Sequence, residues 1–161
     1  MKKGALFSED RTCRYSLSRT WDEEGPKALC IGLNPSTANG EDDDPTIRSL
    51  TRILTNANFG GFTMCNLFPV ISPYPEKVSE WWSGQNEHLK LNDDIILITS
   101  STSRVIICCW GNFSVAKIRA RQIKLIAPYA MCFGHNANGS PKHPLYLKSD
   151  SKLMMFNWKI K

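Results

Sequence analysis

The sequence predicts a single three-layer α/β/α domain with a central, mainly parallel sheet of four strands. The chain has 161 residues, of which 42% are apolar, and this suits one domain with a well-buried core. Short continuous apolar runs alternate with segments of helical periodicity, which is the rhythm of a sheet covered by helices on both faces. No repeat or long linker divides the chain, so residues 1–161 are assigned to one domain.

The strands are predicted from four short apolar runs, whose continuity suits strands buried on both faces of a parallel sheet. These runs are residues 28–33, 62–67, 105–110 and 130–133. Residues 14–17 and 153–158 also look extended, and they either pair with each other or flank the sheet.

The helices are predicted in the segments between these strands. Residues 76–82 predict a short helix, and residues 87–99 and 114–126 predict longer ones. The clearest helix covers residues 46–57, where an Asp-Pro-Thr start signal precedes four apolar residues at helical spacing, Ile47, Leu50, Ile53 and Leu54.

The cysteines predict a reducing compartment. Five of the six lie inside short apolar runs, where a reduced cysteine behaves as a small core residue. No pair has C-x-x-C spacing, so the spacing does not support a metal site. We expect six buried, unpaired thiols and a cytoplasmic location. No apolar run approaches the roughly 20 residues of a membrane span, and no membrane partner is expected.

The net charge of +5 and the sequence pI near 8.9 are compatible with a polyanionic partner. The charge is concentrated in two places, which represent either a solvated helix face with a basic tail or a surface that follows phosphates. These places hold Lys117, Arg119, Arg121 and Lys124, and then Lys148, Lys152, Lys159 and Lys161.

The polar residues that follow the predicted strands indicate a ligand site. In an open parallel sheet, ligands bind beyond the carboxyl ends of the strands. Asparagines, histidines, aromatic residues and glycine turns gather there, in residues 34–37, 66–69, 110–112 and 134–146. This composition suits a planar ligand that forms hydrogen bonds, such as a nucleotide or a nucleic-acid base.

Several of these residues also have purely structural interpretations. Asn34 before a proline forms Asx-turns readily, and Asn66 is able to satisfy the backbone of a buried loop. The acidic residues 42–44 resemble a metal cluster, but consecutive aspartates point in different directions. We expect them to form a solvated loop in which Asp44 or Thr46 caps the following helix.

Six segments together resemble the bacterial and phage family called domain of unknown function 1643. The resemblance extends from about residue 13 to residue 155. It is carried by residues 14–17, 32–38, 44–48, 66–68, 110–111 and 141–146. By its name, that family implies no activity.

The same segments are more distantly similar to the uracil-DNA glycosylase superfamily. Its first motif, Gly-x-Asp/Asn-Pro, matches Gly32-Leu33-Asn34-Pro35, and its base-reading asparagine matches Asn66. Its third strand often ends in Trp-Gly, as Trp110-Gly111 does here, and its last motif partly matches His143-Pro144-Leu145. The similarity implies a glycosylase-like fold and hydrolysis of the N-glycosidic bond of a base in nucleic acid.

The similarity also implies roles for individual residues, without a metal or a cofactor. Asn34 would orient the attacking water, and His143 would donate to the base as negative charge develops on it. Asn66 would read the base edge. Further ligand contacts are expected from Phe68 by stacking, from Leu145 or Tyr146 as a wedge, from Lys142 at a phosphate, and from Gly32, Pro35, Ser36, Asp44, Thr46, Arg48 and Trp110.

Two departures from the superfamily pattern leave more than one function open. Asn34 stands where stronger members carry aspartate, and Ser36 stands where uracil enzymes carry an aromatic residue. The first hypothesis is a slow hydrolase acting on a modified base. The alternatives are a binding or sequestering module that kept the pocket without the chemistry, and an enzyme acting on free nucleotides. The expected partner is nucleic acid, with DNA preferred to RNA, or a free nucleotide, and we expect a monomer.

Overall fold

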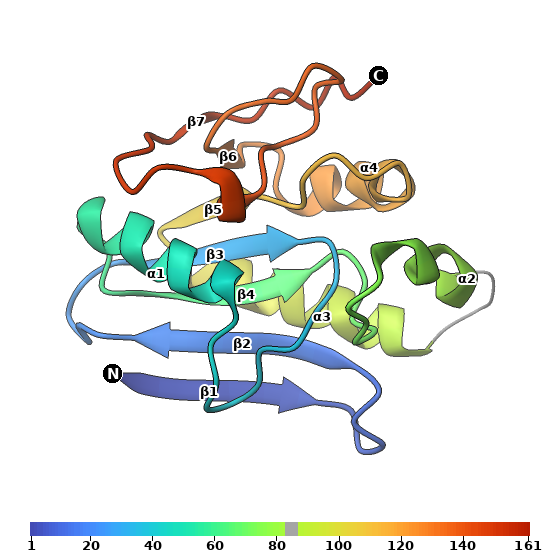
Figure 1. Ribbon diagram of the computed structural model, residues 1–161, viewed down its shortest axis with the longest axis horizontal. Coiled ribbons are helices and arrows are strands. Elements are labelled where there is room, and N and C mark those ends of the chain that lie inside the picture. Colours follow the sequence, from blue (N-terminus) through green and yellow to red (C-terminus); the bar gives the residue numbers. More distant parts are fainter. Residues whose placement is uncertain (83–86) are drawn as a thin grey trace.

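The computed structural model describes residues 1–82 and 87–161 and has an α/β fold built on one mixed sheet (Figure 1). Within the described residues this sheet has seven strands in the order β1-β2-β4-β3-β5-β6-β7. The strands are β1 (Lys2–Phe7), β2 (Arg14–Thr20), β3 (Lys27–Gly32), β4 (Gly61–Asn66), β5 (Val105–Cys108), β6 (Met131–Cys132) and β7 (Met154–Met155).

The centre of the sheet is parallel and its margins are antiparallel. Strand β3 pairs in parallel with both β4 and β5, and β5 pairs in parallel with β6. These four strands correspond to the four predicted apolar runs. The sheet is wider than predicted because β1 and β2 extend it at one margin and β7 at the other, all through antiparallel pairs. The two extended terminal segments therefore flank the sheet on opposite sides and do not pair with each other.

Helices cover both faces of the sheet, as predicted. Helix α1 (Pro45–Asn56) crosses one face, and α3 (Glu87–Thr102) and α4 (Ala116–Ile126) cover the other. Shorter helical segments are α2 (Val78–Trp82) and two 3-10 turns, η1 (Pro75–Lys77) and η2 (Pro144–Tyr146). No helix in the described ranges is long and apolar enough to cross a bilayer.

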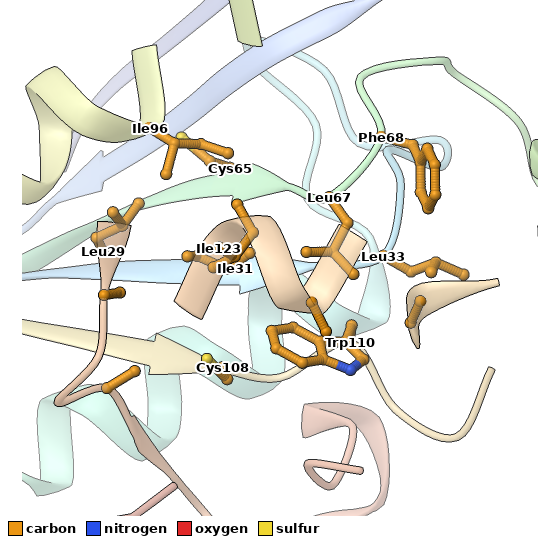
Figure 2. Close-up of a cluster of buried hydrophobic side chains, with 14 of the residues drawn as sticks. Leu29, Ile31, Leu33, Cys65, Leu67, Phe68, Ile96, Cys108, Trp110 and Ile123 are labelled. Atoms are coloured by element: carbon orange, nitrogen blue, oxygen red, sulfur yellow. The ribbon is translucent and has the colours of Figure 1, made fainter. Parts of the chain in front are cut away.

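Side-chain alternation along β3 divides the core between these two faces. Ala28 and Cys30 pack with the apolar side of α1, whereas Leu29 and Ile31 pack with residues of α3 and α4. Figure 2 shows the second of these clusters, in which Ile123 of α4 lies against the sheet. A strand that is buried on both faces carries apolar residues without interruption, which explains the clear sequence signal of β3.

All six cysteines are unpaired and buried, which confirms the prediction. Cys108 and Cys109 belong to the clusters on opposite faces of the sheet. Burial raises the pKa of Cys65 to about 12 and raises that of Cys108 as well, so both thiols stay protonated at neutral pH.

The acidic loop before α1 is anchored to the sheet, which corrects the prediction of a solvated loop. The Arg19 side chain on β2 is fully buried and forms an ion pair with Asp43 at 2.6 Å. The Arg19 guanidinium also donates to the carbonyls of Ser18 and Asn39. Among residues 42–44, only Asp42 is exposed as expected. The ion pair was not predicted because Arg19 and Asp43 are 24 residues apart, and no local sequence pattern indicates such a pair.

We predict that Asp43→Ala destabilises the protein by about 3 kcal/mol, because it leaves the Arg19 charge buried without its partner. The matched control is Asp42→Ala, which removes the same charge from the exposed neighbour and should change stability by less than about 0.5 kcal/mol. Urea unfolding followed by circular dichroism measures both. Equal effects for the two variants would contradict the anchoring role of Asp43.

Candidate ligand-binding site

A cavity of about 350 Å³ lies at the carboxyl ends of β3 and β4, between the start of α1 and the turn η2. We call it the rim cavity. Nine residues predicted from the sequence line it: Gly32, Asn34, Ser36, Asp44, Thr46, Asn66, His143, Leu145 and Tyr146. The predicted convergence of Asn34, Asn66 and His143 on one cavity is thus observed. Residues that sequence reasoning did not assign to the site also line it, among them Arg14, Ser72 and Phe113.

Asn66 presents a buried amide with an unused donor. Its side chain is 1% exposed, and its Nδ2 has no hydrogen-bond partner within the described chain. The carbonyl of Asn66 accepts from Asn92 Nδ2 at 2.9 Å, so the backbone at this strand end is held by α3. The prediction that the Asn66 side chain only satisfies loop backbone is therefore not supported.

Gly32 makes room for this amide. It is the β3 residue paired with Asn66 on β4, and a Cβ at Gly32 would lie 2.8 Å from Asn66 Oδ1 and 2.4 Å from Met64 Cε. Any other residue at this position would push the amide away from β3. The missing side chain of Gly32 therefore leaves space for the Asn66 amide.

Asn34 is held by its amide nitrogen. Nδ2 donates to the carbonyls of Pro35 and Ser72, both at 2.9 Å, and this ties the loop after β3 to the loop after β4. These carbonyls orient the side-chain amide. No donor for Asn34 Oδ1 is found among the described residues, so this oxygen remains available as an acceptor in the rim cavity.

His143 precedes the turn η2 and is set up as a hydrogen-bond donor. Its Nδ1 accepts from the backbone N–H of Leu145 at 3.3 Å, so the neutral ring carries its proton on Nε2. Burial lowers the pKa of His143, while the Asp44 carboxylate acts in the opposite direction. The ring is therefore neutral at pH 7 and has an N–H to offer.

Gly111 determines how closely the backbone approaches His143. It has φ +82°, a conformation that other residues rarely adopt, and a Cβ there would lie 3.3 Å from His143 Cβ. The glycine after β5 thus lets the loop carrying His143 approach the strand end.

Arg14 brings a buried positive charge to the rim cavity. Its side chain is 2% exposed, Nη1 donates to the carbonyl of Ala38, and Nε has no partner in the described part of the chain. Burial lowers its pKa to about 10, so the guanidinium remains charged at neutral pH. Because β2 runs antiparallel to β4, its first residue reaches the rim where β4 ends. The sequence signals for Arg14 were its place in an extended segment and in one of the segments that resemble the family called domain of unknown function 1643.

Asp44 is the cap of α1 and the single carboxylate among the described residues that line the rim cavity. Its side chain accepts from the backbone N–H of Ile47 at 2.9 Å, which confirms the predicted cap. Burial lowers the pKa values of both Arg14 and His143, and the negative charge of Asp44 partly opposes that effect at both residues. No group of His, Cys, Asp and Glu able to hold a metal occurs in residues 1–82 and 87–161.

Five predicted contact residues lie outside the lining of the rim cavity. Phe68 and Trp110 are completely buried in the core cluster that Figure 2 shows, so their rings cannot meet a ligand there. Trp110 packs edge-on against Phe156 with ring centroids 5.4 Å apart. Large aromatic rings contribute most to stability when they are buried away from water. The position of Phe68 and Trp110 near strand ends did not indicate whether their rings face the core or the rim cavity. The remaining three are Pro35, Arg48 and Lys142.

A family model described as "protein of unknown function (DUF1643)" matches residues 14–145. This region contains every residue that lines the rim cavity except Tyr146. No match was found among curated proteins or among solved structures.

We predict that Asp44→Asn lowers the pKa of His143 further. The substitution keeps a side-chain oxygen for the helix cap and removes the negative charge that favours the imidazolium. An NMR titration of the imidazole measures this pKa, with Asp150→Asn as the control for a distant carboxylate. A His143 pKa that stays constant or rises in Asp44→Asn would contradict the described electrostatics.

Proposed function

Because the chain belongs to the DUF1643 family, whose description assigns no activity, we propose its function from the site itself: the rim cavity binds a nucleobase, and the protein hydrolyses the N-glycosidic bond of that base. The observation that carries this proposal is the buried Asn66 amide without a hydrogen-bond partner for its Nδ2. Leaving a buried donor unsatisfied costs about 1–3 kcal/mol. A ligand carbonyl or ring nitrogen bound there would remove that cost.

The other polar groups of the rim cavity suit the edge of a base. His143 Nε2–H and Asn66 Nδ2 are donors, and Asn34 Oδ1 is an acceptor. Base edges carry donors and acceptors side by side in one plane, and a site of fixed amides and a fixed imidazole reads such an edge. A volume of about 350 Å³ is sufficient for one base with its sugar.

The proposed reaction needs a positioned water and stabilisation of the leaving base. The bond between C1′ and the base nitrogen breaks, its electron pair leaves with the base, and a water oxygen bonds to C1′. Asn34 Oδ1 orients that water, and the Asp44 carboxylate accepts its proton. His143 Nε2–H donates to the base carbonyl on which negative charge develops. The products are the free base, which takes up one proton, and a sugar with a hydroxyl at C1′.

The similarity to the uracil-DNA glycosylase superfamily supports this proposal. Gly32 and Asn34 of the first motif, Asn66 of the second and His143 of the last all line one cavity. Gly32, Asn34 and Asn66 lie at or just beyond the carboxyl ends of the parallel strands β3 and β4, where ligands of open parallel sheets bind, and His143 reaches the cavity from the turn η2. A glycosylase-like fold is part of this proposal. The six free thiols suit the reducing compartment of the cytoplasm, where we place the protein.

A second candidate, a module that binds a base or nucleotide without hydrolysis, is favoured by the hydrogen bonds of Asn34. Its Nδ2 ties two loops together, and this is a structural role that does not need catalysis. The two candidates share the rim cavity and differ only in whether a bond is broken.

We predict that Asn34→Ala lowers the rate of base release by about a hundredfold or more, because the water loses its orienting acceptor. Binding of the substrate should change little. The assay uses DNA and RNA oligomers with natural and modified bases, and mass spectrometry detects released base and abasic sites. Asn66→Ala should instead weaken binding of the preferred base by about tenfold, since it removes one buried polar contact.

Asn56→Ala is the control, because Asn56 is an exposed asparagine at the end of α1 outside the rim cavity. Asn34→Asp supplies a stronger acceptor and should accelerate a genuine hydrolase. If the wild-type protein releases no base from any oligomer and Asn66→Ala still weakens binding, the binding module replaces the hydrolase.

A further inference from the structure

Positive charge is concentrated in the part of the chain that follows α3. Residues 103–161 contain ten lysines and arginines and a single acidic residue, Asp150, whereas residues 1–102 contain ten and fourteen, respectively. Of the ten lysines and arginines in residues 103–161, Arg119 is the only one that forms an ion pair within the described residues, and its partner is Asp93. The basic segment builds β5, α4, β6, η2 and β7, which lie together in the upper half of Figure 1. One side of the molecule is therefore strongly positive.

Two further hollows lie beside the rim cavity on this positive side, each sharing lining residues with its neighbour. A hollow of about 300 Å³ shares Phe113, His143 and Tyr146 with the rim cavity. We call it the aromatic hollow. A third hollow, of about 210 Å³, shares Asn136 with the aromatic hollow and reaches Lys159 and Lys161. We call it the lysine hollow. No acidic residue of the described chain lines either one.

Two exposed rings stand where the rim cavity meets the aromatic hollow. Tyr146 is 83% exposed and Phe113 is 38% exposed, so both offer ring surface to a ligand. The Tyr146 ring lies 6.1 Å from the His143 ring and is tilted by 56° to it. Exposed aromatic rings beside a basic groove are how proteins hold unpaired bases, each stacked base contributing about 1–3 kcal/mol.

Lys159 and Lys161 belong to the C-terminal segment, whose contacts fix their position beside the lysine hollow. Trp158 and Ile160 line a separate hollow against α4, whereas Lys159 and Lys161 line the lysine hollow. Trp158 Nε1 donates to the carbonyl of Pro128 at 3.1 Å, and the backbone N–H of Lys161 donates to the carbonyl of Asn138 at 2.8 Å. These contacts hold the segment in place beside the hollow.

We infer that the ligand of the proposed base-binding site is a single strand of nucleic acid and not a free nucleotide. One base occupies the rim cavity, a neighbouring base stacks on Tyr146 and Phe113, and the sugar–phosphate backbone continues to Lys159 and Lys161. A free nucleotide would fill only the rim cavity and would leave the aromatic hollow and the lysine hollow empty. This inference rests on the proposed function, because it assumes that the rim cavity takes a base.

The test compares a single-stranded oligomer of about 12 nucleotides with a mixture of the four nucleoside monophosphates. The oligomer contains all four bases, is made as DNA and as RNA, and carries fluorescein for anisotropy measurements between about 50 and 200 mM KCl. We expect the oligomer to bind more tightly than the monophosphates and with a steeper salt dependence. The DNA and RNA arms show which sugar is preferred.

Two sets of variants locate the strand. Lys159→Gln combined with Lys161→Gln should reduce the slope of log Kd against log salt by about 1.4, the value for two phosphate contacts on a single strand. The control, Lys2→Gln with Lys3→Gln, removes the same charge at the opposite margin of the sheet and should leave the slope unchanged. Tyr146→Ala should weaken oligomer binding about tenfold, while Tyr129→Ala, at an equally exposed tyrosine (83%), should not.

Several results would overturn the inference. One is equal affinity and equal salt dependence for the oligomer and the monophosphates. Another is a duplex that binds as tightly as the single strand, or heparin that competes as well as unlabelled oligomer. If Asn66→Ala weakens binding of the monophosphates while the oligomer has no advantage, the proposed function survives and the inference fails. If neither ligand binds, both fail.

Discussion

The parallel pairing of β3 with β4 is the constraint on which the site depends. Their register places Gly32 opposite Asn66 at the shared carboxyl end, and the absence of a side chain on Gly32 leaves the Asn66 amide its place. The pairing continues past the strands, since the backbone N–H groups of Leu67 and Phe68 donate to the carbonyls of Gly32 and Leu33. The two loops therefore leave the sheet together, and Asn34 bonds across to the loop after β4. Asn34 and Asn66 share a cavity because of this pairing.

Two buried arginines on β2 hold the other wall of the rim cavity. Arg14 donates to the carbonyl of Ala38, and Arg19 binds the carbonyl of Asn39 and the carboxylate of Asp43. Both arginines thereby fasten the loop that leads to Asp44 and the first turn of α1. This loop has few apolar residues, so hydrophobic burial does little to order it. Charge-assisted hydrogen bonds from the two arginines to its carbonyls hold it in place instead. The same arrangement leaves Arg14 Nε without a partner beside the rim cavity.

The distribution of charge and the position of the site are consistent with one direction of ligand approach. The acidic residues belong mainly to the first part of the chain, and the second part carries an excess of lysine and arginine. Because β5, β6 and β7 follow one another toward one margin of the sheet, this excess is collected on one side. For the single strand that we propose as ligand, this charge would favour approach toward the aromatic and lysine hollows. Asp44 is the exception, a carboxylate retained inside the rim cavity because it caps α1.

Local sequence patterns were sufficient for the parts of this protein whose physics is local. The four central strands are continuous apolar runs because they are buried on both faces, Asp44 caps α1 three residues before the N–H that it binds, and the cysteines sit among core residues. The convergence of Asn34, Asn66 and His143 also followed, since parallel strands bring their carboxyl ends to one rim.

The remaining features required the folded chain. Strand β1 has no buried residue and begins with two lysines, so it lacks the long apolar run of the central strands. The ion pair of Arg19 with Asp43 joins distant segments. Phe68 and Trp110 are buried because the loops after β4 and β5 direct their rings into the core. Arg14 reaches the rim cavity because β2 pairs antiparallel with β4. Side-chain direction at a strand end is determined by neighbours far along the sequence, and no local periodicity records those neighbours.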